Sequence, residues 1–281
     1  MRLRAITDLL WKGFFWLSGL FILLVLLAII SYLIWRGGPY INSQFILGNP
    51  AGTPLGSEGG ILPAIKGTLW LVLLALVFSI VPGLLTAIYL SEYGRSGRLA
   101  EMINLLVQSM SGVPSIVVGL FVYALGVVTL GWGISLLAGG LALAIMVFPV
   151  IVVSSRDALL AVDENYRLVA NSLGVAQSYT LRRVILPRAA AGILAGILLA
   201  LGYAAGATAP IMVTAAAIIA DSSGALLEPV MALPYHLYIL FNEHISMNQA
   251  YATALVLVIL LLLLNTLALW LHSLQERINN R

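Results

Sequence analysis

Long apolar runs alternate with short polar connections along this chain of 281 residues. Six of the runs are long enough to cross a membrane, because a spanning helix needs about 20 mostly apolar residues. Unpaired backbone groups in lipid cost several kcal/mol each, so the runs are expected to be helices. The pattern predicts an all-α, polytopic membrane protein with six transmembrane helices, near residues 14–35, 68–90, 103–129, 134–154, 189–218 and 250–271.

The first run follows a basic start and is too long for the apolar core of a cleaved signal peptide, so it is interpreted as a retained anchor helix. The stretch 37–67 is rich in Gly, Pro, Asn and Ser, which predicts an irregular outer connection. The chain is therefore divided into an anchor helix with its outer loop, residues 1–64, and a transmembrane domain, residues 65–281.

Glycine and proline punctuate two of the later runs. Gly112, Pro114 and Gly119 interrupt the third, and Gly206-Ala-Thr-Ala-Pro210 interrupts the fifth. Ordinary helix packing is one interpretation, since small residues are common where transmembrane helices touch. The other is a kinked wall that exposes Ser115 or Thr208 to a polar path, because irregular backbone at membrane depth is tolerated where it lines a cavity.

The composition strengthens the membrane assignment. Hydrophobic residues make up 61% of the chain and charged residues 9%, against about 25% charged in typical soluble domains. The chain has no cysteine, which excludes disulfide and thiol chemistry. Lys and Arg exceed the acidic residues by only 14 to 11, so the charge gives no ground for a nucleic-acid partner.

The positions of Lys and Arg predict the orientation, because short cytoplasmic loops carry an excess of these residues. If both termini are cytoplasmic, only Arg36 and Lys66 lie outside. The last outer loop, about 219–249, contains acidic residues but no Lys or Arg. The twelve remaining cations then lie inside: Arg2, Arg4, Lys12, Arg95, Arg98, Arg156, Arg167, Arg182, Arg183, Arg188, Arg277 and Arg281.

A polar, arginine-rich segment separates two stretches that carry no charge, 102–155 and 189–220. Residues 163–187 of this segment are predicted to form two short helical pieces around Gly174. Pro187 suits the first turn of the following helix, where its missing N–H is not needed. Taken alone, the segment is either an amphipathic loop on lipid headgroups or a surface offered to a partner on the inner side.

The segment resembles the signature of ABC-importer permeases, which is Glu-Ala-Ala, three residues, Gly, nine residues, Ile-x-Leu-Pro. Ala170, Gly174, Leu186 and Pro187 match at the expected spacing and Val184 is a conservative match, whereas Leu168 and Val169 depart from the leading Glu-Ala. In that family the segment forms a coupling helix that docks on a cytoplasmic ATPase. The resemblance implies an ATPase-coupling loop within 156–188, carried by Arg167, Ala170, Asn171, Ser172, Gly174, Leu186 and Pro187.

Two further segments, 111–123 and 233–238, resemble the phosphate-importer permeases of the PstA type, and the likeness runs from about residue 65 to the end. It implies a type I ABC importer (MetI-like) permease fold in the cytoplasmic (inner) membrane. The implied partners are a second homologous permease, two cytoplasmic ATP-binding subunits and an extracytoplasmic phosphate-binding protein. Such permeases often have Gly-Glu-Thr where this chain has Gly206-Ala207-Thr208, so a role for that acidic residue does not transfer.

The chain carries no signature of catalysis. It lacks the Gly-x-x-x-x-Gly-Lys-Ser/Thr phosphate cradle, so ATP is expected on a partner and no cofactor is expected here. His236, His244 and His272 show no metal-ligand spacing. The predicted function is a non-catalytic permease subunit that imports inorganic phosphate, with Ser115 and Thr208 as candidate residues of the path.

Two alternatives remain open on the residues alone. The same architecture serves another oxyanion or small solute equally well. A stand-alone secondary transporter or channel is a different class of protein, which would carry inverted repeats or ionisable residues within the membrane.

Overall fold

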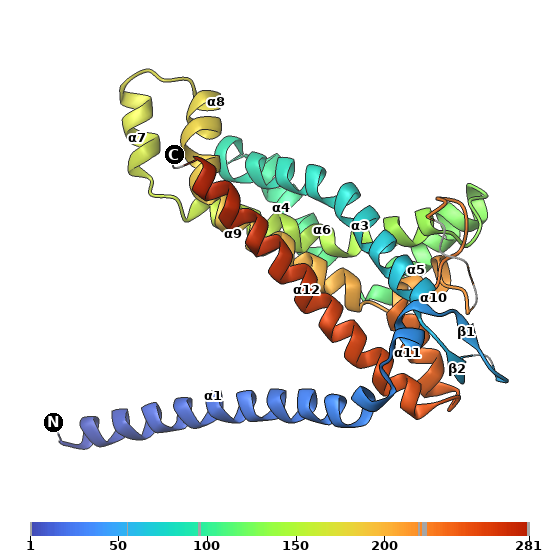
Figure 1. Ribbon diagram of the computed structural model, residues 1–281. Coiled ribbons are helices and arrows are strands. Elements are labelled where there is room, and N and C mark those ends of the chain that lie inside the picture. Colours follow the sequence, from blue (N-terminus) through green and yellow to red (C-terminus); the bar gives the residue numbers. More distant parts are fainter. Residues whose placement is uncertain (1, 55, 95–96, 219, 221–223, 280–281) are drawn as a thin grey trace.

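The chain is mostly helical, with one short hairpin near its start (Figure 1). The computed structural model describes residues 2–54, 56–94, 97–218, 220 and 224–279. Three residues used for the predicted orientation, Arg95, Asp221 and Arg281, lie outside the described residues.

The elements follow one another in a simple order. Two strands, β1 (Pro50–Ala51) and β2 (Glu58–Gly59), pair antiparallel with Pro50 opposite Gly59. Three π-helical turns extend the helices: Tyr89–Tyr93 after α3, Tyr123–Thr129 after α5 and Leu181–Ile185 before α9. The helices are α1 (Arg2–Gly37), α2 (Ser43–Leu47), α3 (Leu62–Ile88), α4 (Arg98–Ser111), α5 (Ser115–Val122), α6 (Leu136–Leu160), α7 (Asn165–Ser172), α8 (Gln177–Thr180), α9 (Leu186–Gly206), α10 (Ala209–Thr214), α11 (Leu233–Asn242) and α12 (Met247–Asn279).

Five of the six predicted spans correspond to helical stretches, and the bounds predicted for the fifth, 189–218, are corrected because its helix begins at Gln177 and ends at Gly206. Five helical stretches of the described chain are long and apolar enough to cross a membrane: 10–40, 62–93, 136–160, 177–206 and 247–267. The third span along the chain, predicted as one run near 103–129, is broken into α4 and α5, and the chain bends by 103° between them. Pro114 explains the break, because it disfavours helical backbone at Val113 and cannot donate a helical hydrogen bond.

Helix α6 forms the centre of the bundle and packs against α3 on one side and α9 on the other. Glycine permits both close approaches. A Cβ on Gly83 of α3 would lie 2.8 Å from Ile151 Cγ2, and a Cβ on Gly196 of α9 would collide with Ser154 Cβ. Gly83 therefore serves packing, and Pro82 beside it lies within the continuous helix α3.

The segment Gly131-Trp132-Gly133 connects the third span to α6. Both glycines have positive φ, 71° and 68°, which few other residues adopt without strain. The Trp132 ring packs on α5's extension, because a Cβ on Gly126 would lie 2.7 Å from ring carbon Cε3. The turn returns the chain from the broken third span into α6.

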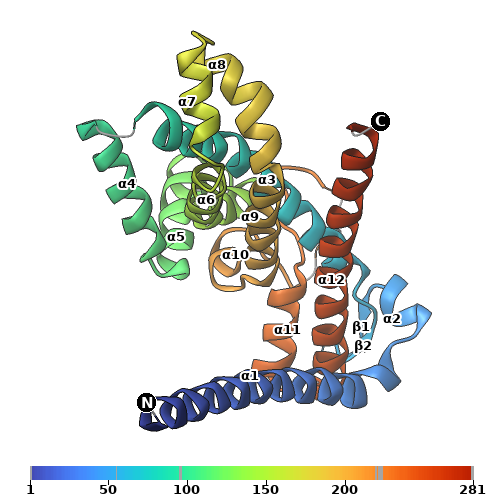
Figure 2. The same ribbon diagram turned by 90° about the vertical axis from the view of Figure 1, so that its left-hand side faces the viewer.

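The two ends of the bundle differ in character (Figures 1 and 2). Helices α7 and α8 project from one end, and the C-terminal end of α12 lies on the same side. The hairpin, α2 and α11 lie at the opposite end. A buried hydroxyl ties this end together, since Thr68 Oγ1 donates to the carbonyl of Ala64 and accepts from the N–H of Leu233, both at 2.8 Å.

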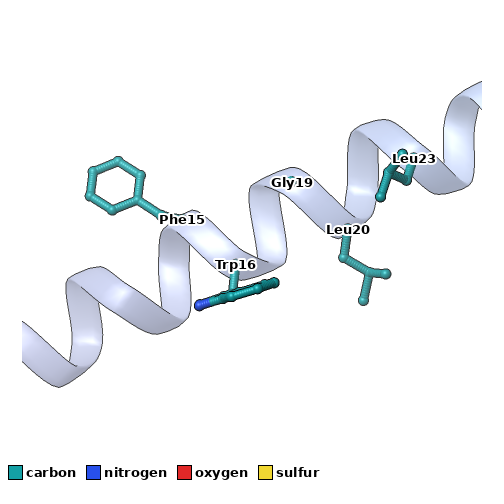
Figure 3. Close-up of a pocket in the computed structure, with 5 residues that line it drawn as sticks. All are labelled: Phe15, Trp16, Gly19, Leu20 and Leu23. Carbon is teal, nitrogen blue, oxygen red and sulfur yellow. The ribbon is translucent and has the colours of Figure 1, made fainter. Parts of the chain in front are cut away.

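Helix α1 diverges from the bundle and contacts it mainly near its C-terminal end (Figure 2). There the Tyr32 and Tyr251 hydroxyls lie 3.3 Å apart. Figure 3 shows the side chains of Phe15, Trp16 and Leu20 projecting from the helix, and all three are more than half exposed. Such exposed apolar side chains suit lipid. The N-terminal end lies far from α7, so its cytoplasmic side stays a prediction.

The charge distribution predicts that α7 and α8 lie in the cytoplasm and the loop before α11 lies outside. Because the chain has no cysteine, single cysteines at the exposed positions Ser178 and Leu227 report the two sides cleanly. An impermeant maleimide applied to whole cells should label Leu227→Cys and should reach Ser178→Cys only after permeabilisation. Labelling of Ser178→Cys with protection of Leu227→Cys would reverse the topology.

Candidate functional site

The projecting loop has the predicted form of two helical pieces around a glycine. The Asp163 side chain starts α7 by accepting the N–H of Asn165 at 2.9 Å. Gly174, between α7 and α8, has φ +69°, and a Cβ placed on it would meet nothing within 4 Å. Leu168 and Leu173 are 56% and 74% exposed. The loop thus offers apolar side chains and an open backbone beyond the end of the bundle.

A buried arginine attaches the loop to the bundle. Arg167 Nη2 lies 2.6 Å from Glu92 Oε1, and the two side chains are only 8% and 5% exposed. The same guanidinium donates to two carbonyls at the end of α6, those of Leu159 at 2.8 Å and Val162 at 2.9 Å. Carbonyls at a helix C-terminus lack partners within the helix. Arg167 therefore closes the end of α6 and pairs with the end of α3 at once.

Glu92 is also the contact point of α8. The Gln177 side-chain amide donates to the Glu92 carbonyl at 2.7 Å. A cavity of about 240 Å³ lies between the loop and the bundle at this point, and it is lined by Glu92, Glu164, Arg167, Asn171, Gln177, Thr180 and Leu181. Glu92 and Gln177 are not among the predicted site residues. One feature of the sequence could have identified Glu92. It is a carboxylate at the end of a predicted span, where an arginine of a neighbouring loop can neutralise it.

The structure separates the predicted coupling residues into three groups. Arg167 faces inward, as described. Leu186 and Pro187 form the first turn of α9, and Leu186 packs against a core cluster that includes Leu181 and Ile185. The residues left at or near the loop surface are Ala170, Asn171, Ser172 and Gly174.

The two interrupted spans touch each other inside the bundle. Helix α9 ends at Gly206, Ala207 is extended, and α10 begins at Ala209. A Cβ on Gly119 of α5 would lie 2.7 Å from Pro210 Cα and 2.9 Å from Pro210 O. The broken third span therefore packs backbone to backbone on the broken fifth span, and Gly119 has a packing role.

Ser115 and Thr208 differ from most hydroxyls of the spans. Thr214 Oγ1, for example, donates to the carbonyl of Pro210 at 2.8 Å within its own helix. The hydroxyls of Ser115 and Thr208 are partly exposed and have no hydrogen bond to any residue that the structure describes. The structure joins the two spans at Gly119 and Pro210 rather than through these two side chains.

The histidines do not gather, because His236 and His244 lie at the α11 end of the bundle and His272 belongs to the C-terminal part of α12. His236 in α11 is buried, which lowers its pKa to about 4, so it is neutral at pH 7. His244 is exposed on the turn after α11, and the side chain of His272 lies outside the described residues. Within the described part of the chain, no group of three or more His, Cys, Asp and Glu residues is placed to hold a metal ion.

Comparison with known proteins identifies relatives of the chain. Residues 79–278 match the family model described as binding-protein-dependent transport system inner membrane component. The phosphate transport system permease protein PstA 2 of Mycobacterium bovis is 37% identical over 212 residues, which cover 74% of this chain and 70% of the relative. A probable phosphate transport system permease protein PstA of Methanocaldococcus jannaschii is 36% identical over 270 residues, 92% of each chain.

A solved structure shares the fold. A chain from the inward-facing MetNI methionine ABC transporter superposes with a TM-score of 0.62 at 19% sequence identity, covering 79% of this chain and 96% of that one. The expected MetI-like architecture is therefore confirmed at the level of the fold.

The contact between α5 and α10 predicts that a larger side chain lowers the stability of the chain at Gly119 but not at Gly202. Gly119→Leu should destabilise the isolated chain in detergent by about 1–3 kcal/mol, because its Cβ meets backbone atoms that cannot rotate away. Gly202→Leu is the matched control, since a Cβ on Gly202 of α9 meets nothing within 4 Å. Thermal unfolding of the two variants measures the difference. Equal melting temperatures would contradict the close packing of the two broken spans.

Proposed function

Because the chain belongs to the family of binding-protein-dependent transport system inner membrane components, we propose that it is the permease subunit of an ATP-driven importer of inorganic phosphate. It is a multi-pass membrane protein, and the family description supports the cytoplasmic (inner) membrane. The relatives named phosphate permeases support phosphate as the cargo, and their alignment extends to 92% of the chain.

The projecting loop is the observation that carries the proposal. Its exposed apolar residues and open glycine form a surface without a covering segment in the described chain, and such surfaces favour protein contacts. The loop stands beyond the ends of α3 and α6 rather than along their flanks, which favours a cytoplasmic protein over lipid headgroups as its partner (Figure 1). We assign this partner as an ATP-binding subunit, so the chain itself holds no ATP and performs no hydrolysis.

The remaining partners follow from the same assignment. A second permease subunit completes the membrane path, two ATP-binding subunits drive it, and an extracytoplasmic phosphate-binding protein delivers the cargo to the outer end. In this arrangement residues 65–281 form the transmembrane domain, with the coupling loop in 156–188, and residues 1–64 form an anchor helix with its outer loop.

The path for the anion is assigned to the meeting point of the two broken spans. The uncharged stretches 102–155 and 189–220 supply the helices at this point. Neutral hydroxyl and backbone donors can bind an oxyanion and release it again, whereas several fixed cations would hold it. Ala207 leaves the site without a carboxylate, and this feature is equally compatible with another oxyanion.

Coupling through the loop predicts that bulk at Gly174 uncouples transport. Gly174→Leu should lower ³²P-phosphate uptake per ATP hydrolysed by about tenfold or more in proteoliposomes of the complete complex, which corresponds to at least about 1.4 kcal/mol. Inside the chain a Cβ here meets nothing, so the loss would come from the docked partner.

Gly174→Ala is the control for backbone strain. Alanine bears the same penalty of about 1–2 kcal/mol for left-handed backbone but adds little bulk. It should keep most of the coupling. Normal coupling in Gly174→Leu would contradict docking at this surface, and absence of phosphate uptake in the unaltered complex would contradict the proposed cargo.

A path through the broken fifth span predicts that Thr208 contributes a donor. Thr208→Val removes the hydroxyl at nearly constant volume. A lost hydrogen-bond partner costs about 1–3 kcal/mol, so phosphate uptake should fall about 5- to 150-fold at unchanged protein level. Uptake of ³²P-phosphate over a range of concentrations, with sulfate as competitor, measures the effect and the selectivity together.

Thr214→Val is the matched control, because the Thr214 hydroxyl already donates within its own helix. It should leave uptake within about twofold of the unaltered complex, as expected for a substitution away from the path. Unchanged uptake in Thr208→Val would return Thr208 to a packing role, and strong inhibition by sulfate would favour a broader oxyanion carrier.

A further inference from the structure

The loop is attached to the membrane helices in two physically different ways. Helix α8 continues through the π-helical turn into α9, so this attachment is covalent and helical over residues 177–206. Helix α7 has no such continuity with a span. Its attachment to the ends of α3 and α6 depends on the side chain of Arg167.

Around this attachment α7 has little apolar anchorage. Arg167 is the buried residue of α7, and the neighbouring Tyr166, Leu168 and Val169 are 41%, 56% and 57% exposed. A displacement of α7 can therefore reach α3 and α6 either along the chain or through the guanidinium of Arg167, whereas it can reach α9 where the Arg188 guanidinium lies 4.0 Å from the centre of the Tyr166 ring. The guanidinium is planar and carries five donors in a fixed fork, which makes the joint directional.

The partners of the guanidinium belong to both neighbouring helices. The Glu92 carboxylate belongs to the π-helical turn that ends the second span. The two carbonyls are that of Leu159 in the last turn of α6 and that of Val162, two residues beyond the end of α6. A side chain that holds a carboxylate and two helix-end carbonyls cannot follow α7 without pulling on both helices. Because the pair is buried, solvent screens it little.

We propose that the Glu92–Arg167 pair is a positioning joint that transmits movement of α7 to α3 and α6, while α8 transmits movement to α9 through the continuous helix. The inference rests on the proposed function, since it assumes an ATP-binding partner on the loop. It assigns roles to two residues that touch neither the cargo nor the nucleotide.

Amide hydrogen exchange of the assembled complex, with and without ATP, tests the joint directly. In the unaltered complex ATP should change exchange at the inner ends of α3, α6 and α9. In Glu92→Gln, which keeps the size and an acceptor but removes the charge, the change should be lost in α3 and α6 and retained in α9. Phosphate uptake per ATP hydrolysed should fall in parallel.

Three further variants sharpen the result. Arg167→Lys keeps the charge but lacks the fork, so its loss should be intermediate. The double variant Glu92→Gln/Arg167→Lys should be no worse than the more affected single variant, because both act on one joint. Glu164→Gln is the control, because the Glu164 side chain is 54% exposed and its contact with Arg167 Nη1 is longer, at 3.4 Å. This variant should retain the ATP response of α3, α6 and α9.

The possible outcomes distinguish a failure of the Glu92–Arg167 joint from a failure of the proposed function. An ATP response in α3 and α6 that survives Glu92→Gln would overturn the joint, as would additive losses in the double variant. Failure of both single variants to assemble would assign the pair to folding and would also overturn it. An unaltered complex without any ATP response in α9 would contradict the proposed function itself.

Discussion

The constraint that organises this chain is that backbone N–H and C=O groups cannot remain unpaired in lipid. Four of the six spans satisfy it without interruption, whereas the third is bent between α4 and α5 and the fifth is interrupted after Gly206. The two interrupted spans pack against each other, because Gly119 allows α5 to contact the backbone of Pro210 in α10.

At the end of the bundle near α7, one side chain satisfies polar groups of two helices. The end of α6 and the end of α3 both present polar groups that need partners, and the loop supplies one cation for both. A buried ion pair is weak evidence for stability, because desolvation offsets much of the attraction. Its directionality is the more informative property, since the fork of Arg167 fixes the position of α7 relative to two helices. The exposed face of α7 is then held where a cytoplasmic partner can reach it.

The sequence predicted the spans and the shape of the loop because both depend on local patterns. Run length identified the helices, and Gly174 and Pro187 marked the turn and the next helix start. The bend of 103° between α4 and α5 was not predicted, since Pro114 indicates a break but not its angle. The inward orientation of Arg167 and the role of Glu92 were also missed, because they depend on a contact between residues 75 positions apart. The signature places Leu186 and Pro187 with the loop, whereas in the structure they form the first turn of α9 and Leu186 packs against a core cluster.

The central claim is that this chain moves phosphate only when an ATP-binding partner drives it. The most direct measurement is ³²P-phosphate uptake into proteoliposomes of the complete complex, with the binding protein outside and nucleotide inside. Uptake should require hydrolysable ATP and should persist when ion gradients are collapsed by ionophores. Uptake without ATP that follows an imposed ion gradient would identify a secondary transporter and would contradict the account.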